Sequence, residues 1–271
     1  MFKRFKKWYL KMAGGQATIE APIQRSQNQH WDITVDVAVV GFGGAGASAA
    51  IEAKDHSASV AVIERFNGGG STRISGGIIY AGGGTAIQAG AAVIDNPDNM
   101  YNYLVQETGD VVSAATLRMF CEESATNIDW LMQLGVPFEP SLCPFKTSYP
   151  SNDYYLYYSG NESFPPYSNT AEPAPRGHRA HGKGVSGAAL FQPLQDAAQR
   201  KGVQLLTQHR ALGLICNERG DVVGLQLSKM TAGALMTWVY RHLYALLIYS
   251  RYAGMYAPVI TWCLRALLED L

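Results

Sequence analysis

Residues 36–46 read DVAVVGFGGAG, a short apolar run followed at once by closely spaced glycines. Such a run is typical of a central parallel strand. The small residues AGASAAIEA (45–53) then predict a helix that packs close to a sheet, and SVAVIE (59–64) predicts a second strand. Strand, helix and strand within about thirty residues form a βαβ unit. We therefore expect an α/β fold built on a parallel sheet.

The glycines of this unit, Gly41, Gly43 and Gly46, have the spacing G-x-G-x-x-G. In a dinucleotide site the first permits a tight turn, the second lets the backbone approach a pyrophosphate, and the third packs helix on strand. The helix N-terminus offers N–H groups to the phosphates. Glu64 closes the second strand, where a carboxylate can accept both ribose hydroxyls. Arg65 leaves open a cofactor with a 2′-phosphate. The pattern favours a dinucleotide site over glycines used only for packing.

A long glycine-rich segment follows the second predicted strand. The chain has 28 glycines in 271 residues, about 10% against a usual ~7%, and most of the excess lies between residues 41 and 90. We expect residues 66–92 to form an ordered loop without a helical or strand period. A simple nicotinamide-dependent dehydrogenase would need no such loop after its second strand. NGGGSTRISGGIIYAGGGT (67–85) offers many backbone donors for a flavin, so the loop favours FAD over NAD.

GFGGAG, Glu64, GGSTRISGG and YAGGGT resemble the FAD-binding domain of the fumarate reductase and 3-ketosteroid dehydrogenase flavoprotein superfamily. The resemblance spans about residues 33–228, and residues 176–215 are similar to a later helix and strand of that family. It implies a Rossmann-like FAD-binding domain: a parallel sheet with helices and a β-hairpin or meander layer. Family members are about twice this length, so we expect an N-terminal portion that stops before the cap domain.

The resemblance also implies the residues that hold the cofactor. They are Gly41, Gly43, Gly44, Ala45, Gly46, Glu64, Arg65, Gly69, Gly70, Ser71, Thr72, Ser75, Gly76, Gly77, Arg210 and Ala211. Membrane succinate dehydrogenases attach FAD through a histidine in the glycine-rich loop. Residues 66–85 contain no histidine, so we expect noncovalent FAD.

The segment 138–182 predicts an irregular, Tyr- and Pro-rich surface excursion or pocket wall. PFKTSYPSNDYYLYYSGNE (144–162) with PAPRGHRAHGKG (173–184) resembles ketosteroid dehydrogenases that act on ring A. This implies a small apolar, steroid-like substrate and an electron acceptor as partners. Dehydrogenation needs a base for a C–H proton, a flavin that takes the hydride at N5, and a group that stabilises the ketone oxygen.

A tyrosine suits both tasks in an apolar pocket. The candidates are Tyr80, Tyr149 and Tyr154, with Tyr155, Tyr157 and Tyr158 beside them. For each of them a role in packing or in lining the pocket is the alternative. Arg176, His178, Arg179 and His181 could instead bind the carboxylate of a fumarate-type substrate, or form a solvated basic turn. A fumarate or enoate reductase is therefore the alternative function.

Other patterns complete the predicted domain. Residues 115–134 have a helical apolar stripe that ends at Gly135. Ser186 is a predicted N-cap for a helix to about Lys201, in which Pro193 is a misfit. Residues 203–208 predict a strand, and 212–216 with 222–227 predict a hairpin with its turn near Gly220.

Composition and the two chain ends restrict the partners and the location that we expect for the protein. The 22 basic and 22 acidic residues cancel, which argues against nucleic acid as a partner. The four cysteines form no CxxC pair and no cluster has metal-ligand spacing, so we expect no metal site and a reducing cytoplasm. Residues 1–32 predict a basic tail. Its first twelve residues suit peripheral contact with the inner face of a membrane, and the alternative is a solvated, frayed end. Residues 229–271 predict an apolar helical insertion, in which the longest charge-free run, 252–264, is below the ~18 residues of a span. A truncated product that only contacts membranes or partners is a further alternative.

Overall fold

The computed structural model describes residues 22–25, 30–229, 238 and 242. At its centre is a parallel sheet in the order β2-β3-β7, formed by Val37–Val40, Val60–Glu64 and Gln204–Thr207. All five residues of β3 are buried, as expected for a middle parallel strand. The predicted α/β fold on a parallel sheet is confirmed.

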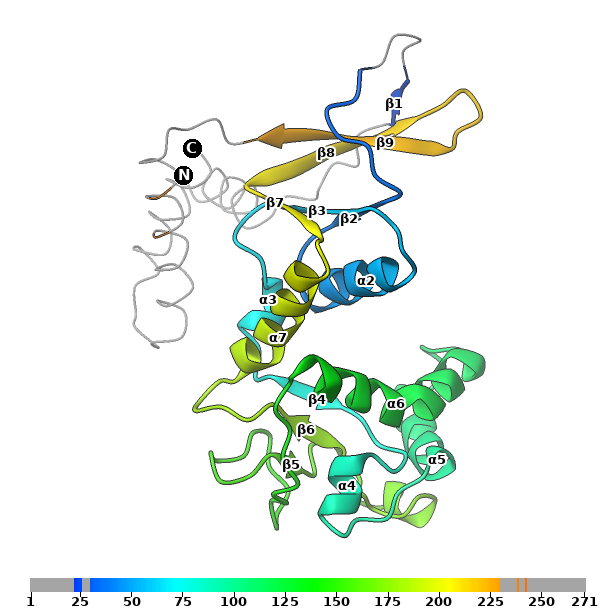
Figure 1. Cartoon of the computed structure of the whole chain (residues 1–271). Helices are drawn as coiled ribbons and strands as arrows, with labels where there is room; N and C mark the ends of the chain where they lie inside the picture. Colours follow the sequence, from blue (N-terminus) through cyan, green and yellow to red (C-terminus); the bar gives the residue numbers. More distant parts are fainter. Residues whose placement is uncertain (1–21, 26–29, 230–237, 239–241, 243–271) are drawn as a thin grey trace, which may run out of the picture.

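Two helices and a hairpin form the layers on either side of this sheet (Figure 1). Helices α2 (Gly44–Asp55) and α7 (Gly187–Arg200) pack together against one face. Phe191 of α7 packs against Phe42 in the turn before α2, and the two rings lie edge to face with centroids 5.5 Å apart. The predicted helices at 45–53 and from Ser186 are confirmed, and α7 continues through Pro193.

Over the other face lies an antiparallel hairpin of β8 (His209–Cys216) and β9 (Val222–Lys229) (Figure 1). Its turn contains Gly220 at φ +85°, so the predicted hairpin is confirmed with longer strands. A two-residue strand, β1 (Ile23–Gln24), pairs with the far end of β8 in parallel. The sequence assigned these two residues to the tail, because a two-residue strand has no detectable period.

A second region contains most of residues 78–182 and packs below α7 (Figure 1). Its sheet has the order β4-β6-β5, formed by Ile78–Tyr80, Gly177–Arg179 and Leu156–Tyr157. Its helices are α4 (Ala86–Gly90), α5 (Pro97–Thr108), α6 (Ala114–Leu134) and the 3₁₀ turn η1 (Tyr167–Asn169). Helix α6 matches the predicted helix 115–134, and Gly135 ends it in the left-handed conformation.

The expectation of a loop without regular structure over residues 66–92 is wrong. This segment contains α3 (Gly70–Arg73), β4 and α4. Each is only three to five residues long, too short to show a period. Strand β4 exists because β6 pairs with it, and α4 begins with a capping box between Thr85 and Gln88.

Two predictions fall where the structure gives no description: the amphipathic segment 1–12 and nearly all of the apolar segment 229–271. Within the described part of the chain, none of the helices combines the length and the apolar character needed to cross a membrane.

Candidate functional site

The turn of residues 41–46, here called the glycine turn, joins β2 to α2. Gly41 has φ +97°, which favours glycine, and its N–H donates to the carbonyl oxygen of Ile63 at 2.8 Å. A Cβ on Gly46 would lie 2.0 Å from the Gly41 carbonyl oxygen. The first and third glycines of the pattern are therefore required by the fold itself.

Gly43 differs from its two neighbours in the pattern. It is the N-cap residue of α2 and has an ordinary φ of −96°. A Cβ there would meet nothing closer than the Gly69 carbonyl oxygen at 3.8 Å. Protein packing alone does not demand glycine at this position. Its missing side chain leaves room in front of the helix N-terminus, which suits the approach of a phosphate group.

Glu64 lies at the carboxyl end of β3 and is 8% exposed. Its two carboxylate oxygens accept from the backbone N–H of Phe42 at 2.8 Å and of Phe66 at 2.7 Å. These bonds hold the carboxylate between the glycine turn and the segment after β3. Each carboxylate oxygen keeps acceptor capacity for a further donor such as a ribose hydroxyl.

Residues 69–77, predicted to line a flavin, connect the starts of α2 and α7. The Thr72 hydroxyl accepts from the Gly44 N–H at 3.0 Å, and the Gly69 N–H donates to the Phe42 carbonyl oxygen at 2.6 Å. At the other end, the Gly187 N–H donates to the Ser75 carbonyl oxygen at 2.9 Å. The structure thus brings this segment next to the glycine turn. Gly70 and Ser71 are exposed at the beginning of α3.

Around Gly76 and Gly77 the segment packs tightly against the start of α7. Ser186 occupies the predicted N-cap position, but its side chain makes no capping bond. Its hydroxyl donates to the Gly76 carbonyl oxygen at 3.0 Å instead. A Cβ on Gly77 would lie 2.6 Å from the Ser186 backbone. The explanation of Ser186 as a helix cap is wrong, because the neighbouring loop offers its hydroxyl an acceptor.

The remaining predicted cofactor residues lie at the same end of the sheet or just beyond it. Arg65 is exposed and its guanidinium lies 5.1 Å from the centroid of the Phe66 ring. Arg210 is exposed and Ala211 half-buried at the beginning of β8. Between them and β7 lies Gln208, a buried residue that the sequence did not single out.

The candidate tyrosines differ in what their hydroxyls contact. The Tyr149 hydroxyl is within hydrogen-bond distance of the carbonyl oxygens of Gly76, at 2.9 Å, and Gly184, at 2.8 Å. Tyr149 therefore joins two loops as a structural clamp. Tyr154 is half-buried, with its ring edge-on to Phe145. Tyr155 and Tyr157 are buried at 4% and 1% exposure, and burial raises the pKa of Tyr157 to about 12.

Tyr80 has a different environment, beside a second buried acid. Its hydroxyl donates to Glu162 at 3.3 Å. Glu162 is 1% exposed and accepts from the Gly160 N–H at 2.9 and 3.1 Å. Burial raises the pKa of both groups, and the nearby Glu162 charge raises that of Tyr80 further. Tyr80, Tyr103, Lys146 and Asn161 are among the residues that line a cavity of about 300 Å³.

The polar residues Thr85, Gln88, Asp95, Arg176 and His178 form a buried group, here called the Arg176 cluster. Arg176 binds Asp95 in a bidentate pair, Nε to Oδ2 at 2.9 Å and Nη2 to Oδ1 at 2.8 Å, and neither side chain is exposed. Burial raises the pKa of Asp95, but the Arg176 hydrogen bonds and charge outweigh this effect and lower it. The Gln88 amide also donates to Asp95, at 3.1 Å.

His178 completes the Arg176 cluster. Its Nδ1 faces the Arg176 carbonyl oxygen at 3.1 Å, which can only accept, so Nδ1 carries the proton. Its Nε2 then accepts from the Thr85 hydroxyl at 2.8 Å. Burial lowers the pKa of His178 to about 4. The ring is therefore neutral at neutral pH.

Arg179 is also buried, and both of its terminal guanidinium nitrogens have partners in the interior. Its guanidinium donates to five oxygens, among them the carbonyl oxygens of Ser151 and Gly184 at 2.7 Å each. His181 alone of the four predicted basic residues is exposed, and it pairs with Glu139. The interpretation of residues 176–181 as a solvated basic turn is wrong. Arg176 and Arg179 already have internal partners, which argues against the predicted carboxylate site.

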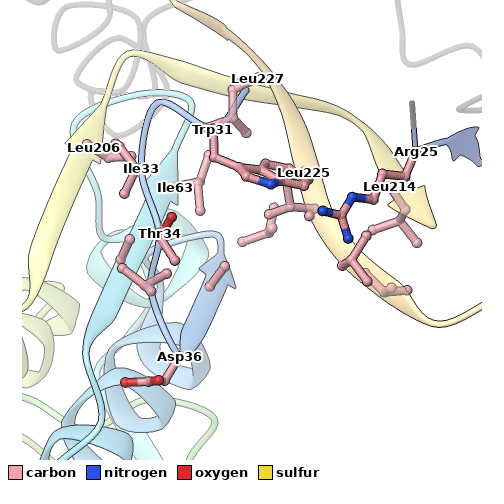
Figure 2. Close-up of a pocket in the computed structure, with 17 residues that line it drawn as sticks. Arg25, Trp31, Ile33, Thr34, Asp36, Ile63, Leu206, Leu214, Leu225 and Leu227 are labelled. Atoms are coloured by element: carbon pink, nitrogen blue, oxygen red, sulfur yellow. The ribbon is translucent and has the colours of Figure 1, made fainter. Parts of the chain in front are cut away.

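A separate cavity of about 530 Å³ lies between the parallel sheet and the hairpin (Figure 2). Among its mostly apolar lining, Figure 2 shows Trp31, Ile63 and Leu225 facing one another. The Trp31 ring covers Gly224, where a Cβ would lie 2.3 Å from it. Within the described chain, the residues predicted to bind FAD do not line this cavity. The candidate cofactor site lies instead at the start of α2, where the glycine turn leaves β2.

The glycine turn, Glu64 and segment 69–77 fit a dinucleotide chemically. The open backbone at Gly43 suits a pyrophosphate, and the fixed carboxylate of Glu64 suits a ribose. Asp95, Glu162 and Gln208 are among the buried polar residues that sequence reasoning missed. Asp95 and Asn96 directly before Pro97 signal a helix start, but nothing in the sequence around Gln208 or Glu162 indicates burial.

Comparisons with known proteins identify the family of the chain. The model of the family described as FAD binding domain matches residues 36–243. Over 207 residues the chain is 44% identical to 3-oxo-5-alpha-steroid 4-dehydrogenase of Comamonas testosteroni, covering 75% of this chain and 39% of the relative. Over 202 residues it is 27% identical to a fumarate reductase (cytochrome) of Shewanella frigidimarina, covering 74% and 31%.

Among solved structures, the 3-ketosteroid-delta4-(5alpha)-dehydrogenase of Rhodococcus jostii RHA1, in complex with 4-androstene-3,17-dione, matches with a TM-score of 0.73 and 35% identity. That match covers 79% of this chain and 46% of the solved one. A flavocytochrome c3 fumarate reductase matches with a TM-score of 0.56 and 24% identity, which shows a shared fold. The chain thus spans less than half the length of these relatives.

Proposed function

The chain belongs to the FAD binding domain family, and from this premise we propose that it is the cofactor-binding part of an FAD-dependent dehydrogenase for a 3-oxo-5α-steroid. The observation that carries the proposal is 44% identity to a steroid 4-dehydrogenase, against 27% to a fumarate reductase over nearly the same length. The internal pairing of Arg176 and Arg179 also favours an apolar substrate over a carboxylate.

FAD would be held noncovalently, since residues 66–85 contain no histidine. Bound FAD would supply the hydride acceptor for dehydrogenation. In this proposal the glycine turn with Gly44 and Ala45 orients the pyrophosphate at the start of α2, and Glu64 binds the ribose. Segment 69–77, fastened at both ends, would line the flavin with Gly69, Gly70 and Ser71.

Of the three candidate tyrosines, Tyr80 is the one we retain for contact with substrate. Its hydroxyl is not held by main-chain carbonyl oxygens, unlike that of Tyr149. Because burial raises its pKa, Tyr80 would stay protonated at neutral pH. Its single O–H, which donates to Glu162 in this structure, would turn to the ketone oxygen when the substrate binds. The base that removes the C–H proton would then be a different group.

Flavin binding and turnover test the proposal separately. The purified chain should quench FAD fluorescence on titration, and the product of the full reading frame should be yellow. With an artificial electron acceptor, that product should oxidise a 3-oxo-5α-steroid and should not reduce fumarate with reduced viologen. Fumarate reduction without steroid turnover would support the reductase alternative, and absence of FAD binding would refute both.

We also propose a cytoplasmic location with peripheral membrane contact through the basic segment MFKRFKKWYLKM (1–12). Flotation with vesicles that contain anionic lipid measures this contact. It should be lost when residues 1–12 are deleted and should weaken with added salt. Equal flotation of the deleted chain would contradict the proposal. If the chain bound vesicles but took up no FAD, the alternative of a truncated interaction product would gain support.

A further inference from the structure

Gln208 has an unusual backbone for a residue with a long side chain. It lies between β7 and β8, is 9% exposed and has φ +61°. A residue other than glycine in this left-handed region carries a cost on the order of 1–3 kcal/mol. Such strain persists where the surrounding structure fixes it, and it often accompanies a functional role.

The orientation of the Gln208 amide is fixed by its partners. Its Nε2 donates to the Phe66 carbonyl oxygen at 3.1 Å and to Asn67 Oδ1 at 3.0 Å. A flipped amide would place its oxygen against the Phe66 carbonyl oxygen, and both atoms are acceptors only. With Nε2 facing Phe66 and Asn67, the amide oxygen Oε1 points away from these two residues. In the described part of the chain this buried oxygen has no hydrogen-bond partner.

Gln208 and Glu64 hold the same short segment from two sides. Thr207, directly before Gln208, pairs with Glu64 in the register of β7 and β3. Glu64 accepts from the Phe66 N–H, while Gln208 donates to the Phe66 carbonyl oxygen. Both side chains thus lie at the carboxyl ends of parallel strands, where ligands bind in open α/β sheets. Asn67, which accepts from the Gln208 amide, and Thr207, directly before Gln208, help to line a cavity of about 460 Å³.

We propose that Gln208 recognises the adenine of FAD by accepting a hydrogen bond from its exocyclic amine at Oε1. This inference rests on the proposed binding of FAD. A buried acceptor without a partner calls for a donor, because leaving it unpaired costs free energy. In the adenosine half of FAD the donors are the adenine amine and the ribose hydroxyls. The carboxylate of Glu64 would accept from the ribose hydroxyls, so the neutral amide oxygen of Gln208 would accept from the adenine amine.

The test compares FAD with its hypoxanthine analogue, in which a carbonyl oxygen replaces the amine. The purified chain is titrated with each, and with FMN, by flavin fluorescence quenching or calorimetry. Wild type should bind FAD about 10-fold or more tightly than the hypoxanthine analogue, as expected for one hydrogen bond to a buried group. In Gln208→Met this preference should be lost, because the affinity for FAD falls while the affinities for the hypoxanthine analogue and for FMN stay unchanged.

Two further variants separate recognition from folding. Gln208→Gly keeps the left-handed backbone without strain and also removes the amide, so it should lose the preference as Gln208→Met does. Gln204→Met on the exposed side of β7 is the matched control and should bind as wild type. Equal affinity of wild type for the two dinucleotides, or equal weakening of both in the Gln208 variants, would overturn the inference. No FAD binding by wild type would instead overturn the proposed function beneath it.

Discussion

In the glycine turn the decisive contact joins two residues five positions apart, since a Cβ on Gly46 would meet the Gly41 carbonyl oxygen at 2.0 Å. In the Arg176 cluster the decisive contact joins Arg176 and Asp95, which are 81 positions apart. The first region is determined by backbone geometry within one turn. The second exists only after distant strands and helices have packed. The two regions should therefore respond differently to substitution.

The largest effect is expected at the glycine turn, from Gly46→Ala. The added Cβ forces α2 away from β2, so the proposed pyrophosphate site is displaced. FAD affinity should fall by at least about 1000-fold, which is about 4 kcal/mol, and fluorescence titration measures it. Gly213→Ala is the matched control, because a Cβ there would have its nearest neighbour at 3.7 Å. Near-normal FAD binding by Gly46→Ala would show that the turn can move without loss of the site.

The next effect is expected in the Arg176 cluster, from Arg176→Met. This change leaves the Asp95 carboxylate buried without its cation, and the free energy of unfolding should fall by about 3–5 kcal/mol. Chemical denaturation measures the loss. Adding Asp95→Asn should recover part of it, because a neutral amide replaces the unpaired charge. A double variant less stable than Arg176→Met alone would mean that Asp95 matters mainly for its other hydrogen bonds.

A pH dependence is expected from His178 in the same cluster. Burial lowers its pKa to about 4, so between pH 6.5 and 4 the unfolded chain binds a proton that the folded chain does not. The free energy of unfolding should therefore fall as pH decreases through this window. At about 1.4 kcal/mol per pH unit, the whole loss is about 3 kcal/mol. His178→Gln should flatten this slope, and His56→Gln, at an exposed position, should retain it. An unchanged slope in His178→Gln would assign the pH dependence to other groups.

The smallest effect is expected at a local feature of the second region, the start of α5. The Asn96 side chain accepts from the Asn99 N–H at 2.8 Å as an N-cap. Asn96→Ala should cost about 1 kcal/mol of stability, and Asn96→Gly only a few tenths. Thermal unfolding of the two variants checks this order. Equal losses would show that Asn96 acts through more than its cap.

The sequence predicted the features in which neighbouring residues carry the information. The βαβ unit, helix α6 and the hairpin β8–β9 were predicted close to their observed bounds. The sequence failed for α4 and β4, which are too short to show a period. It also failed for Arg176 and Arg179, because whether a cation is solvated or buried depends on what packs against it.

By itself, then, the amino-acid sequence determined the glycine turn and the family of the domain. Glycine spacing acts through steric contacts within one turn, so residues close in the sequence are enough to predict it. Only the tertiary structure decided that Asp95 and Arg176 form a buried pair and that Tyr149 joins two loops. It also gave Gln208 a buried oxygen without a partner beside Glu64. The burial of a side chain and its hydrogen-bond partners depend on residues that are distant in the chain. A local sequence pattern therefore does not predict them.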